Sequence, residues 1–580
     1  MTGLPPLINN IVYSPLLRSV FARSMALYTR QVLRQFERNC RHSPAINQNT
    51  LRKILRRHQH TEFGIAHDFA AILSAPDFLV EYSRRVPLSQ YSDYEPALER
   101  MTVGANNLLC ADPVIFFAPS SGTTGKSKMI PITARGMRSS LRTLLMSRGL
   151  LAKLFPRSSN GDRGISLLRM ADNQTTTAAG IPTGDASAAG LRRAGWVLPF
   201  LYSTPVAALQ IADKPSAIYI HLVFGLLERD LNHISATFAH YALYLFRMLE
   251  TRWPDLLETI ASGRLPADLL LSESERKNIE AQIRIAPSIA KQLRAEFEKG
   301  FENIAQRLWP NLQFLVAVTT GSFAVYIEPL RRYTGAVPIC NLFYGATEAF
   351  IGINTTLDKP NEYALIPGSC VYEFIPVEDA DLPNPAAVGI DALQVGREYE
   401  LVISNDCGFY RYRMDDVIRV TGVVAGNPHV EFCYRRGTIL NLAAEKTAEN
   451  QVADVLHALA RNWRNKNTRI IDYTVIPDAS ITPPCYLFFI EIEDASNQGC
   501  AELQLDAIHH IDAGLAAANV DYRLLREGRA IGMPAVHFVA SGSFEKMLGD
   551  APVGNAVKVA RKLRNPQQLQ FLMQNTLPIE

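Results

Sequence analysis

Residues 116 to 131 read Phe-Phe-Ala-Pro-Ser-Ser-Gly-Thr-Thr-Gly-Lys-Ser-Lys-Met-Ile-Pro, an apolar strand followed by small hydroxylated residues and lysines. The glycines let the backbone turn sharply and direct amides at an anion, while hydroxyls and the ammonium of Lys126 or Lys128 add donors and charge. The stretch therefore predicts a loop that binds nucleotide phosphates. The expected phosphate ligands are Ser120, Ser121, Gly122, Thr123, Thr124, Gly125 and either Lys126 or Lys128.

The loop is not a Walker A motif, which has four residues between its first glycine and Gly-Lys-Ser/Thr. Here Gly125 follows Gly122 after only two residues. A surface loop of the same turn-forming composition is the alternative for this stretch alone. Two further motifs favour the nucleotide.

The second motif is Tyr344-Gly-Ala-Thr-Glu348, which follows the apolar run 337–343 and is predicted to lie at the exit of a strand, with a tight turn at Gly345. The tyrosine ring suits an adenine. The Glu348 carboxylate suits Mg²⁺, which binds one or two carboxylates together with phosphate oxygens. For this motif alone, a solvated glutamate at a strand end is the commoner arrangement.

The third motif is Tyr410-Arg-Tyr-Arg-Met-Asp-Asp-Val-Ile-Arg-Val420, in which apolar and charged residues nearly alternate. A carboxylate at such a strand junction can accept both hydroxyls of a ribose. The alternative is a solvated strand face with cross-strand ion pairs. A nucleotide site explains the presence of all three motifs in this order much better than chance does.

Taken together, these residues resemble the adenylate-forming enzymes, a superfamily of acyl-CoA synthetases, luciferases and peptide-synthetase adenylation domains. The match is closest to the acyl acid amido synthetases, best known for conjugating auxin, jasmonate and benzoates to amino acids. It extends over most of the chain. Further matching segments are Thr61-Glu-Phe-Gly64, Val86-Pro-Leu-Ser-Gln-Tyr-Ser-Asp-Tyr-Glu-Pro96, Gly321-Ser-Phe-Ala-Val-Tyr-Ile327, Gly352-Ile-Asn354, Tyr399-Glu-Leu-Val402 and Glu445-Lys-Thr-Ala-Glu449.

The resemblance implies an α/β fold, with a large N-terminal domain (a β-barrel and two β-sheets flanked by helices) and a smaller α+β C-terminal domain. We expect the large domain, with the ATP and acyl acid sites, to span 1–434 and a mobile small domain to span 435–580. The sequence agrees, because strand-like runs alternate with helical stretches. The expected strands are 114–117, 313–318, 337–343, 371–376 and 399–403, followed by helix 447–462, strand 485–492, helix 501–518 and strand 535–540.

The resemblance also implies roles for single residues. Glu348 would bind magnesium, Asp416 would hold the ribose, and Lys446 would approach the phosphates from the small domain. Lys558, in Gly554-Asn-Ala-Val-Lys-Val-Ala-Arg561, matches the C-terminal catalytic lysine of the family. The expected catalytic set is Lys558, Lys446 and Glu348, and the remaining ATP contacts are Ser322, Tyr344, Gly345, Ala346 and Thr347.

Residues 218–250 are interpreted as helices with wide apolar faces. Leu231, Ile234, Phe238, Tyr241, Ala242 and Leu245 recur at helical spacing, which for any one of them is more often a core-facing stripe. By resemblance this region walls the acyl pocket, with Phe238, Tyr241 and Gly321 as acyl-binding residues, and its aromatic rings favour a flat or aromatic acid. Segment 175–190 is either a mobile flap beside that pocket or an inert surface loop.

Three departures from the family pattern stand out. The phosphate loop is one residue shorter than in the plant amido synthetases and has the spacing of the wider superfamily. Asp415 replaces a common glycine, and its charge could weaken ATP binding or tighten the dependence on magnesium. Ala560 replaces a proline near Lys558, which could make that loop less rigid.

The function implied is that of an acid–amino acid ligase using ATP and Mg²⁺. A small carboxylic acid attacks the α-phosphate and releases pyrophosphate, and an amino acid amine then attacks the acyl-adenylate and releases AMP. Rotation of the small domain about 433–437 could switch between the steps. An acyl-CoA ligase using the same adenylate is one alternative. A non-catalytic nucleotide sensor is another, although Glu348, Asp416 and the two lysines argue against it.

Bulk properties favour a cytoplasmic, monomeric enzyme of at least two domains. The 580 residues are 47% hydrophobic, and 59 basic against 56 acidic residues give a net charge of only +3, so no electrostatic case exists for nucleic acid. Eight cysteines without CxxC and twelve histidines without HExxH indicate neither a disulfide framework nor a zinc site. No apolar run reaches membrane-spanning length, and no membrane partner is expected.

The first 36 residues carry arginines at 18, 23, 30 and 34 and no acid, a pattern shared with organelle transit peptides. We prefer an N-terminal helix packed on the large domain, because the apolar periodicity continues into 51–55.

Overall fold

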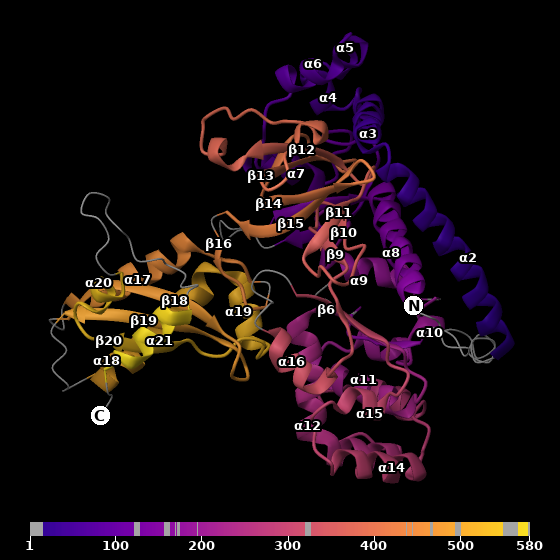
Figure 1. Ribbon diagram of the computed structural model, residues 1–580, viewed down its shortest axis with the longest axis vertical. Helices are drawn as coiled ribbons and strands as arrows, with labels where there is room; N and C mark the ends of the chain where they lie inside the picture. The colour runs from indigo at the N-terminus through magenta and orange to yellow at the C-terminus, as the bar shows by residue number, and fades with distance from the viewer. Residues whose placement is uncertain are drawn as a thin grey trace. The chain divides into compact units, whose positions relative to one another are not determined.

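The computed structural model describes most of the chain (Figure 1). The residues outside the described part are 1–14, 121–127, 156–162, 169, 171–174, 194, 196, 320–325, 437, 444, 465–467, 494–499, 549–565 and 578–580. The chain divides into two compact units. The first holds nearly all of the chain up to Tyr434, and the second holds Arg435 onward together with Tyr326. The mixed α/β class predicted from the sequence is confirmed.

The first unit contains one seven-stranded sheet, ordered β12-β13-β14-β15-β11-β10-β9, and two four-stranded sheets, ordered β2-β1-β5-β4 and β3-β6-β7-β8. Its strands are β1 (Val114–Ser120), β2 (Lys128–Thr133), β3 (Gly164–Ser166), β4 (Thr175–Thr176), β5 (Pro182–Thr183), β6 (His233–Phe238), β7 (Phe314–Val318), β8 (Ile339–Cys340), β9 (Phe343–Gly345), β10 (Phe350–Ile353), β11 (Glu362–Leu365), β12 (Val371–Pro376), β13 (Glu398–Ser404), β14 (Tyr412–Val424) and β15 (Asn427–Arg435).

Helices surround these sheets. They are α2 (Pro15–Cys40), α3 (Ser43–His58), α4 (Glu62–Ala66), α5 (Phe69–Ser74), α6 (Phe78–Arg85), α7 (Tyr91–Thr102), α8 (Ala134–Leu154), α9 (Ala186–Arg193), α10 (Leu198–Leu201), α11 (Lys214–Leu227), α12 (Ala239–Ser262), α13 (Glu273–Glu280), α14 (Pro287–Phe297), α15 (Ile304–Leu308) and α16 (Ile327–Thr334), with short 3₁₀ turns η1 (Val206–Gln210), η3 (Val377–Asp379) and η4 (Ile390–Ala392). Helix starts follow local chemistry, since Thr133 caps α8 and Asp213 caps α11 through side-chain oxygens.

Strands β3, β6, β7 and β8 run parallel, so their carboxyl ends meet at one edge of the sheet. The helical interpretation of 231–238 was wrong, because 233–238 form strand β6 and the next helix starts only at Ala239. A strand buried in a parallel sheet reads as a continuous apolar run and imitates a helix stripe. The consequence for the site is that Phe238 ends a strand at the carboxyl edge.

The tight turn predicted at Gly345 is also wrong. Tyr344 and Gly345 belong to β9, which pairs antiparallel with β10. The turn follows one residue later, where the amide of Ala346 donates to the carbonyl of Ala349 at 2.9 Å. Gly345 is needed for packing, since a Cβ built there would lie 3.2 Å from the Phe350 ring.

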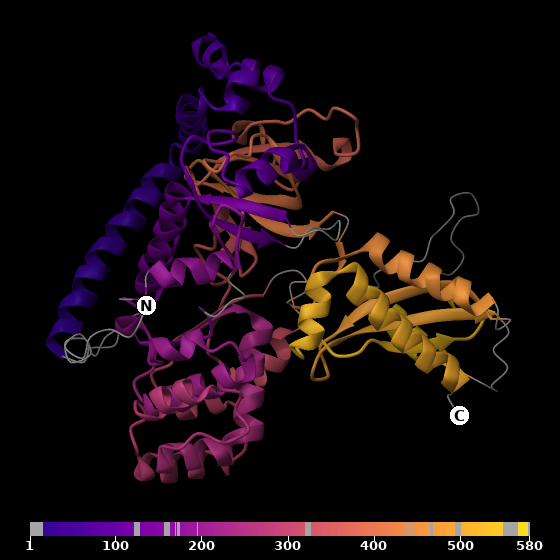
Figure 2. The same cartoon turned by 180° about the vertical axis from the view of Figure 1, so that it is seen from behind.

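The expected N-terminal helix is α2, and it lies along α8, as both views show (Figures 1 and 2). Phe36 of α2 and Leu150 of α8 share one buried cluster. Gly149 permits the close approach, because a Cβ built on it would lie only 2.5 Å from the carbonyl oxygen of Thr29. The two helices therefore form a firmly packed pair.

The second unit has a three-stranded sheet, ordered β18-β19-β20, and a two-stranded sheet, β16-β17. Its helices α17 and α18 pack on each other and on the larger sheet. The elements are β16 (Thr438–Leu440), β17 (Thr447–Ala448), α17 (Glu449–Arg464), β18 (Arg469–Asp478), β19 (Cys485–Glu493), α18 (Cys500–Ala518), α19 (Val520–Glu527), β20 (Ala535–Val539), α20 (Ser543–Leu548) and α21 (Pro566–Gln574). This order matches the α+β pattern expected from the sequence.

Seven cysteines have described side chains, and all seven are free thiols. Six are buried, and Cys433 is half-buried. Burial raises the pKa of Cys40, Cys340 and Cys370 to about 12 and that of Cys433 to about 11. Within the described residues, no helix combines the length and apolar character needed to cross a bilayer.

Candidate functional site

The second and third motifs meet directly. The hydroxyl of Tyr344 donates to Oδ2 of Asp416 at 2.9 Å, and both side chains are buried. The ring centroid of Tyr344 lies 5.6 Å from that of Phe432 in β15 and 5.9 Å from that of Tyr363 in β11. An aromatic side chain and a hydrogen-bonded carboxylate are thus fixed side by side on the seven-stranded sheet.

A β-bulge in β14 presents this carboxylate. Glu400 pairs with Val417 and Val402 pairs with Arg413, so the register shifts across residues 414–416. Asp415 lies in the bulge with φ of 59°, in the left-handed region that glycine adopts without steric cost. The bulge explains why a glycine is common here in the family that the motifs resemble, and Asp415 carries the strain instead.

The predicted phosphate ligand Lys128 joins the same neighbourhood. Its Nζ donates to the hydroxyl of Tyr412, in β14, at 3.0 Å, and lies 5.5 Å from the ring centroid of Tyr91. The hydroxyl of Tyr91 accepts from the amide of Met129 at 2.7 Å. These contacts hold the start of β2, immediately after the phosphate motif, against the ribose strand.

Glu348 lies close to this group. Its backbone carbonyl accepts a hydrogen bond from Nδ2 of Asn405 at 3.0 Å. Burial raises the pKa of Tyr91, and the charges of Glu95, Glu99 and Glu348 act in the same direction. Lys128, through its position beside the ring, and Glu348, through its charge, therefore both act on Tyr91.

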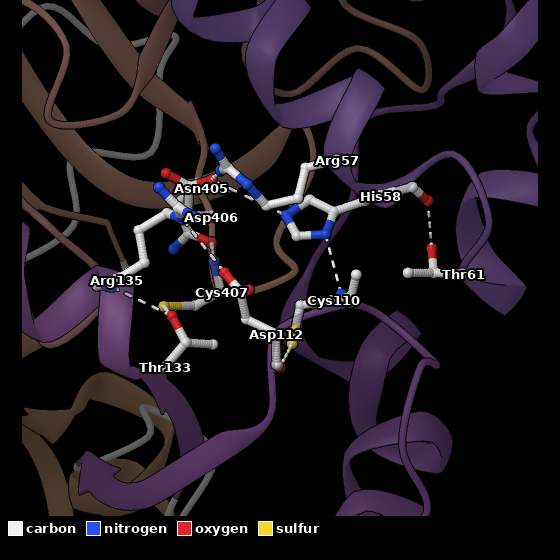
Figure 3. A network of polar contacts seen from close by, with 12 residues as sticks. Arg57, His58, Thr61, Cys110, Asp112, Thr133, Arg135, Asn405, Asp406 and Cys407 are labelled. Carbon is white, nitrogen blue, oxygen red and sulfur yellow. Dashed lines mark hydrogen bonds and ion pairs between the residues drawn. The ribbon is translucent and has the colours of Figure 1, made fainter.

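The loop that holds Glu348 is itself anchored by the polar network of Figure 3. Asp406, next to Asn405, forms an ion pair with Arg57 of α3. His58 accepts the amide of Ala111 at 3.0 Å through Nδ1, and burial together with the charge of Arg57 lowers the pKa of His58 to about 4. The neutral ring therefore serves as a hydrogen-bond acceptor that ties α3 to the chain before β1.

All three arginines of the third motif have structural partners, and that of Arg419 is Glu398 of β13 at 2.7 Å. Arg413 forms a two-pronged ion pair with Glu400 at 2.8 and 2.6 Å, and Arg411 reaches Glu373 at 3.0 Å. The alternative interpretation, cross-strand ion pairs, therefore holds for the arginines of this strand. Asp416 differs from these arginines, because its carboxylate accepts from the hydroxyl of Tyr344.

The expected acyl-binding aromatic residues lie at the carboxyl edge of the parallel sheet. The rings of Phe238 and Tyr241 are 6.3 Å apart, and His240 lies 3.9 Å from Tyr241, measured between centroids. Burial lowers the pKa of His240 well below its usual value, so this imidazole is neutral. Nζ of Lys214 lies 3.6 Å from the Tyr241 ring centroid, which gives this aromatic cluster one cationic edge.

Comparisons with known proteins agree with these motifs. Models of the GH3 family match the chain at its N-terminal domain (32–339), central domain (363–435) and C-terminal domain (450–567). The chain belongs to the GH3 family. It is 27% identical over 532 residues to a jasmonoyl–L-amino acid synthetase, JAR4, of Nicotiana attenuata, covering 89% of this chain and 90% of the relative.

Other relatives of this GH3 protein have related names. The indole-3-acetic acid-amido synthetase GH3.2 of Arabidopsis thaliana is 27% identical over 514 residues, covering 84% of this chain and 91% of the relative. The solved structure of GH3.15 acyl acid amido synthetase superposes with a TM-score of 0.65 at 25% identity, covering 95% of this chain and 97% of the other. The resemblance inferred from the motifs is confirmed at family level.

In the second unit of the GH3 protein, a buried carboxylate organises the loop that carries Lys446, whose amide donates to Oδ1 of Asn441 at 3.3 Å. Glu445 accepts the amides of Leu442 at 2.6 Å and Ala443 at 2.7 Å, and it also accepts the hydroxyl of Tyr486. The backbone of Lys446 has φ of 47°, again in the left-handed region. The loop is thus folded tightly around Glu445, with Lys446 at a defined position upon it.

Several predicted residues of the GH3 protein remain untested by these contacts. Ser120 ends β1, with its backbone paired opposite Lys128, and Gly345, Ala346 and Thr347 lie on β9 and in the turn after it. The remaining residues, Ser121, Gly122, Thr123, Thr124, Gly125, Gly321, Ser322 and Lys558, lie outside the described residues.

Three positions in the site were missed by sequence reasoning. Tyr91, Asn405 and Tyr412 hold Lys128 and Glu348 in place but had no predicted role. Tyr91 and Tyr412 stood within quoted motifs, and only their contacts show that they face the phosphate motif. Nothing in the sequence indicated a role for Asn405 in the site, because an asparagine after a strand usually marks a turn.

The donor set fits a nucleotide with Mg²⁺. Glu348 supplies one half-buried carboxylate, whose charge acts on Tyr91, the tyrosine whose ring lies beside the Lys128 ammonium. Within the described residues, no group of three or more His, Cys, Asp or Glu is placed to hold a metal. A single carboxylate suits Mg²⁺, which completes its shell with phosphate oxygens and water.

Proposed function

We propose that this GH3 protein is an ATP-dependent acyl acid amido synthetase that joins a small carboxylic acid to an amino acid. The observation that carries the proposal is the Tyr344–Asp416 contact at 2.9 Å, because it joins the proposed adenine face to the proposed ribose acceptor; Lys128, a proposed phosphate ligand, bonds to Tyr412 on the same strand as Asp416. The relatives named as jasmonoyl and indole-3-acetic acid synthetases support auxin-, jasmonate- or benzoate-like acids as substrates.

The first step proposed is adenylation. An oxygen of the acid's carboxylate bonds to the α-phosphorus, the bond to the bridging oxygen breaks, and pyrophosphate leaves. Lys128 and the loop 121–127 hold the phosphates, and Asp416, oriented by Tyr344, holds the ribose hydroxyls. Mg²⁺, bound through Glu348, would neutralise charge on the phosphates. The protein's contribution is alignment and charge neutralisation rather than covalent catalysis.

The second step proposed is amide formation. The amine of the amino acid attacks the acyl carbon, the bond to the AMP oxygen breaks, and the amine proton is lost. The cluster around Phe238 and Tyr241, at the carboxyl edge of the parallel sheet, is the proposed acyl wall, consistent with ligand binding at strand carboxyl ends. Gly321 is the third proposed acyl residue.

The proposed domains are 1–434, with the nucleotide and acyl sites, and 435–580, which carries Lys446 and Lys558. Both lysines are proposed to act on the phosphates. Rotation of the small domain about 433–437 is proposed to switch the enzyme between adenylation and amide formation. We propose that the enzyme acts as a monomer in a reducing, cytoplasmic environment.

Product analysis tests the function. The protein is incubated with ATP, Mg²⁺, pooled aromatic and jasmonate-like acids, all amino acids and CoA, and products are identified by mass alongside pyrophosphate release. We expect an acyl-amino acid and AMP. An acyl-CoA product would instead make the protein an acyl-CoA ligase, the alternative that its shorter phosphate loop leaves open. ATP binding with no pyrophosphate release in the presence of any of the acids would contradict both proposals and leave a nucleotide-binding sensor.

A further inference from the structure

Helices α2 and α8 form a predominantly basic surface, in which the one acid, Glu37, pairs with Lys153. Helix α2 carries five arginines and one acid, and α8 carries four arginines, one lysine and no acid. The net charge of the whole chain is only +3, so it does not reveal that positive charge is concentrated on these two helices. Figure 1 shows the two helices side by side along one flank of the first unit.

The arginines on α2 share one face. Arg23, Arg30 and Arg34 follow spacings of seven and four residues, which places them in line on a helix, and all three are exposed. Arg138 and Arg142 are likewise exposed on the neighbouring helix α8. Among the residues that the structure describes, these five guanidinium groups have no carboxylate partner. We call these five residues the arginine face.

Apolar side chains are interleaved with the arginine face. Leu27, between Arg23 and Arg30, is 69% exposed, and Val20 and Tyr28 are each 53% exposed. A groove of about 540 Å³ runs between the two helices. Its lining residues are Tyr28, Gln31, Val32, Gln35, Arg138, Leu141, Arg142 and Leu145.

We propose that the arginine face docks on an anionic lipid bilayer as a peripheral, reversible contact. Guanidinium groups bind phosphate oxygens in forked pairs, and exposed leucine and tyrosine side chains enter the boundary between headgroups and acyl chains. The groove offers phosphate-binding Arg138 and Arg142 above an apolar floor, as a phospholipid headgroup and its first methylenes require. A second copy of this chain is the poorer partner, because two such faces repel each other.

This proposal revises the expectation of no membrane partner, which addressed membrane-spanning segments and net charge. It is independent of the proposed activity. It would place the protein at a surface where apolar carboxylic acids concentrate.

Vesicle co-sedimentation tests the proposal. The full chain is mixed with neutral phosphatidylcholine vesicles or with vesicles containing about 30% phosphatidylglycerol, at about 0.15 M salt. We expect binding to the anionic vesicles only. Each arginine near an anionic surface raises the membrane-binding constant about fivefold. The double variant Arg30→Gln with Arg34→Gln should therefore bind about 25-fold more weakly. Leu27→Ser should weaken it through lost apolar contact.

The matched control is Lys277→Gln with Lys291→Gln, which removes the same charge from exposed positions on α13 and α14. This variant should bind within about twofold of the unmodified protein, and circular dichroism should be the same for all variants. No binding, equal binding to neutral vesicles, or equal losses in both double variants would overturn the proposal. So would arginine-dependent binding of duplex RNA with none to vesicles, which assigns the face to nucleic acid.

Discussion

At the scale of single residues, the contact between Tyr344 and Asp416 determines how well the ribose acceptor is held. Tyr344→Phe keeps the ring and removes the 2.9 Å hydrogen bond to a buried carboxylate. We expect KM for ATP to rise about tenfold, equivalent to about 1.4 kcal/mol, with little change in kcat. Pyrophosphate-release kinetics measure both. Tyr363→Phe, which removes the hydroxyl of a neighbouring tyrosine that accepts from Asn341, is the control and should leave KM unchanged. Equal KM values for all three proteins would remove Tyr344 from the site.

Asp415 combines two effects that substitutions can separate. Asp415→Gly relieves a left-handed backbone and removes a charge, so we expect about 1 kcal/mol more stability and a lower KM for ATP. Asp415→Ala removes the same charge but retains a Cβ at φ of 59°. Thermal unfolding and ATP titration distinguish the two. If alanine stabilises as much as glycine, backbone strain is not the cause.

At the scale of elements, Gly149 sets the distance between α2 and α8. The Cβ of Gly149→Ala would meet the Thr29 carbonyl at 2.5 Å, and backbone cannot yield as a flexible side chain can. We expect a loss of about 2 kcal/mol in the free energy of unfolding, measured with urea. Gly190→Ala, in helix α9 with no atom within 4 Å of the new Cβ, should be neutral or stabilising. Equal effects would contradict the close-packing argument.

Helix α11 contains a histidine that makes the first unit acid-sensitive. His221 is buried, its Nδ1 lies 2.9 Å from Oγ1 of Thr204, and burial lowers its pKa to about 3. Because the pKa in the folded state lies below the unfolded value of about 6.5, the stabilisation is complete above pH 6.5 and is lost as the pH falls toward 3.

Asparagine does not titrate. When the pH is lowered from 7.5 to 5, we therefore expect the free energy of unfolding of His221→Asn to fall by about 2 kcal/mol less than that of the unmodified protein. Urea unfolding at both pH values measures the difference, and other histidines cancel because both proteins carry them. Identical pH dependence in the two proteins would show that His221 does not contribute.

The sequence predicted the elements best where one signal dominated. Turn residues bounded short strands such as β1 and β12, and the second and third motifs named Tyr344 and Asp416, which the structure brings into contact. Prediction failed at β6, since a buried parallel strand and a helix share an apolar pattern. It also missed Asn405 and the bulge at Asp415, which depend on pairing between strands distant in sequence.

At the scale of the whole molecule, the second unit offers Lys446 on a loop organised by Glu445. Glu445→Gln would place an amide N–H against one of three hydrogen-bond donors, Leu442, Ala443 or Tyr486. If Lys446 serves adenylation, we expect the single-turnover rate of adenylation to fall about tenfold with KM for ATP nearly constant.

The double variant with Lys446→Met identifies the route of this effect. A residue that acts only through Lys446 should cause no further loss once the lysine is absent. If the rate losses of the two single variants instead multiply in the double variant, Glu445 acts by another route, such as general destabilisation. Glu298→Gln, at an exposed position, is the control for the charge change.

The burial of the native cysteines has a practical consequence for optical experiments. Thiol-reactive dyes require thiolate, and the raised pKa values of the seven described thiols leave almost none at neutral pH. With Cys500→Ser as the one precaution, two cysteines introduced on exposed positions of the two units can therefore be labelled selectively in an otherwise native background. Single-molecule energy transfer between the dyes would then follow the proposed rotation through each turnover, without the cysteine-free variant that such measurements usually demand.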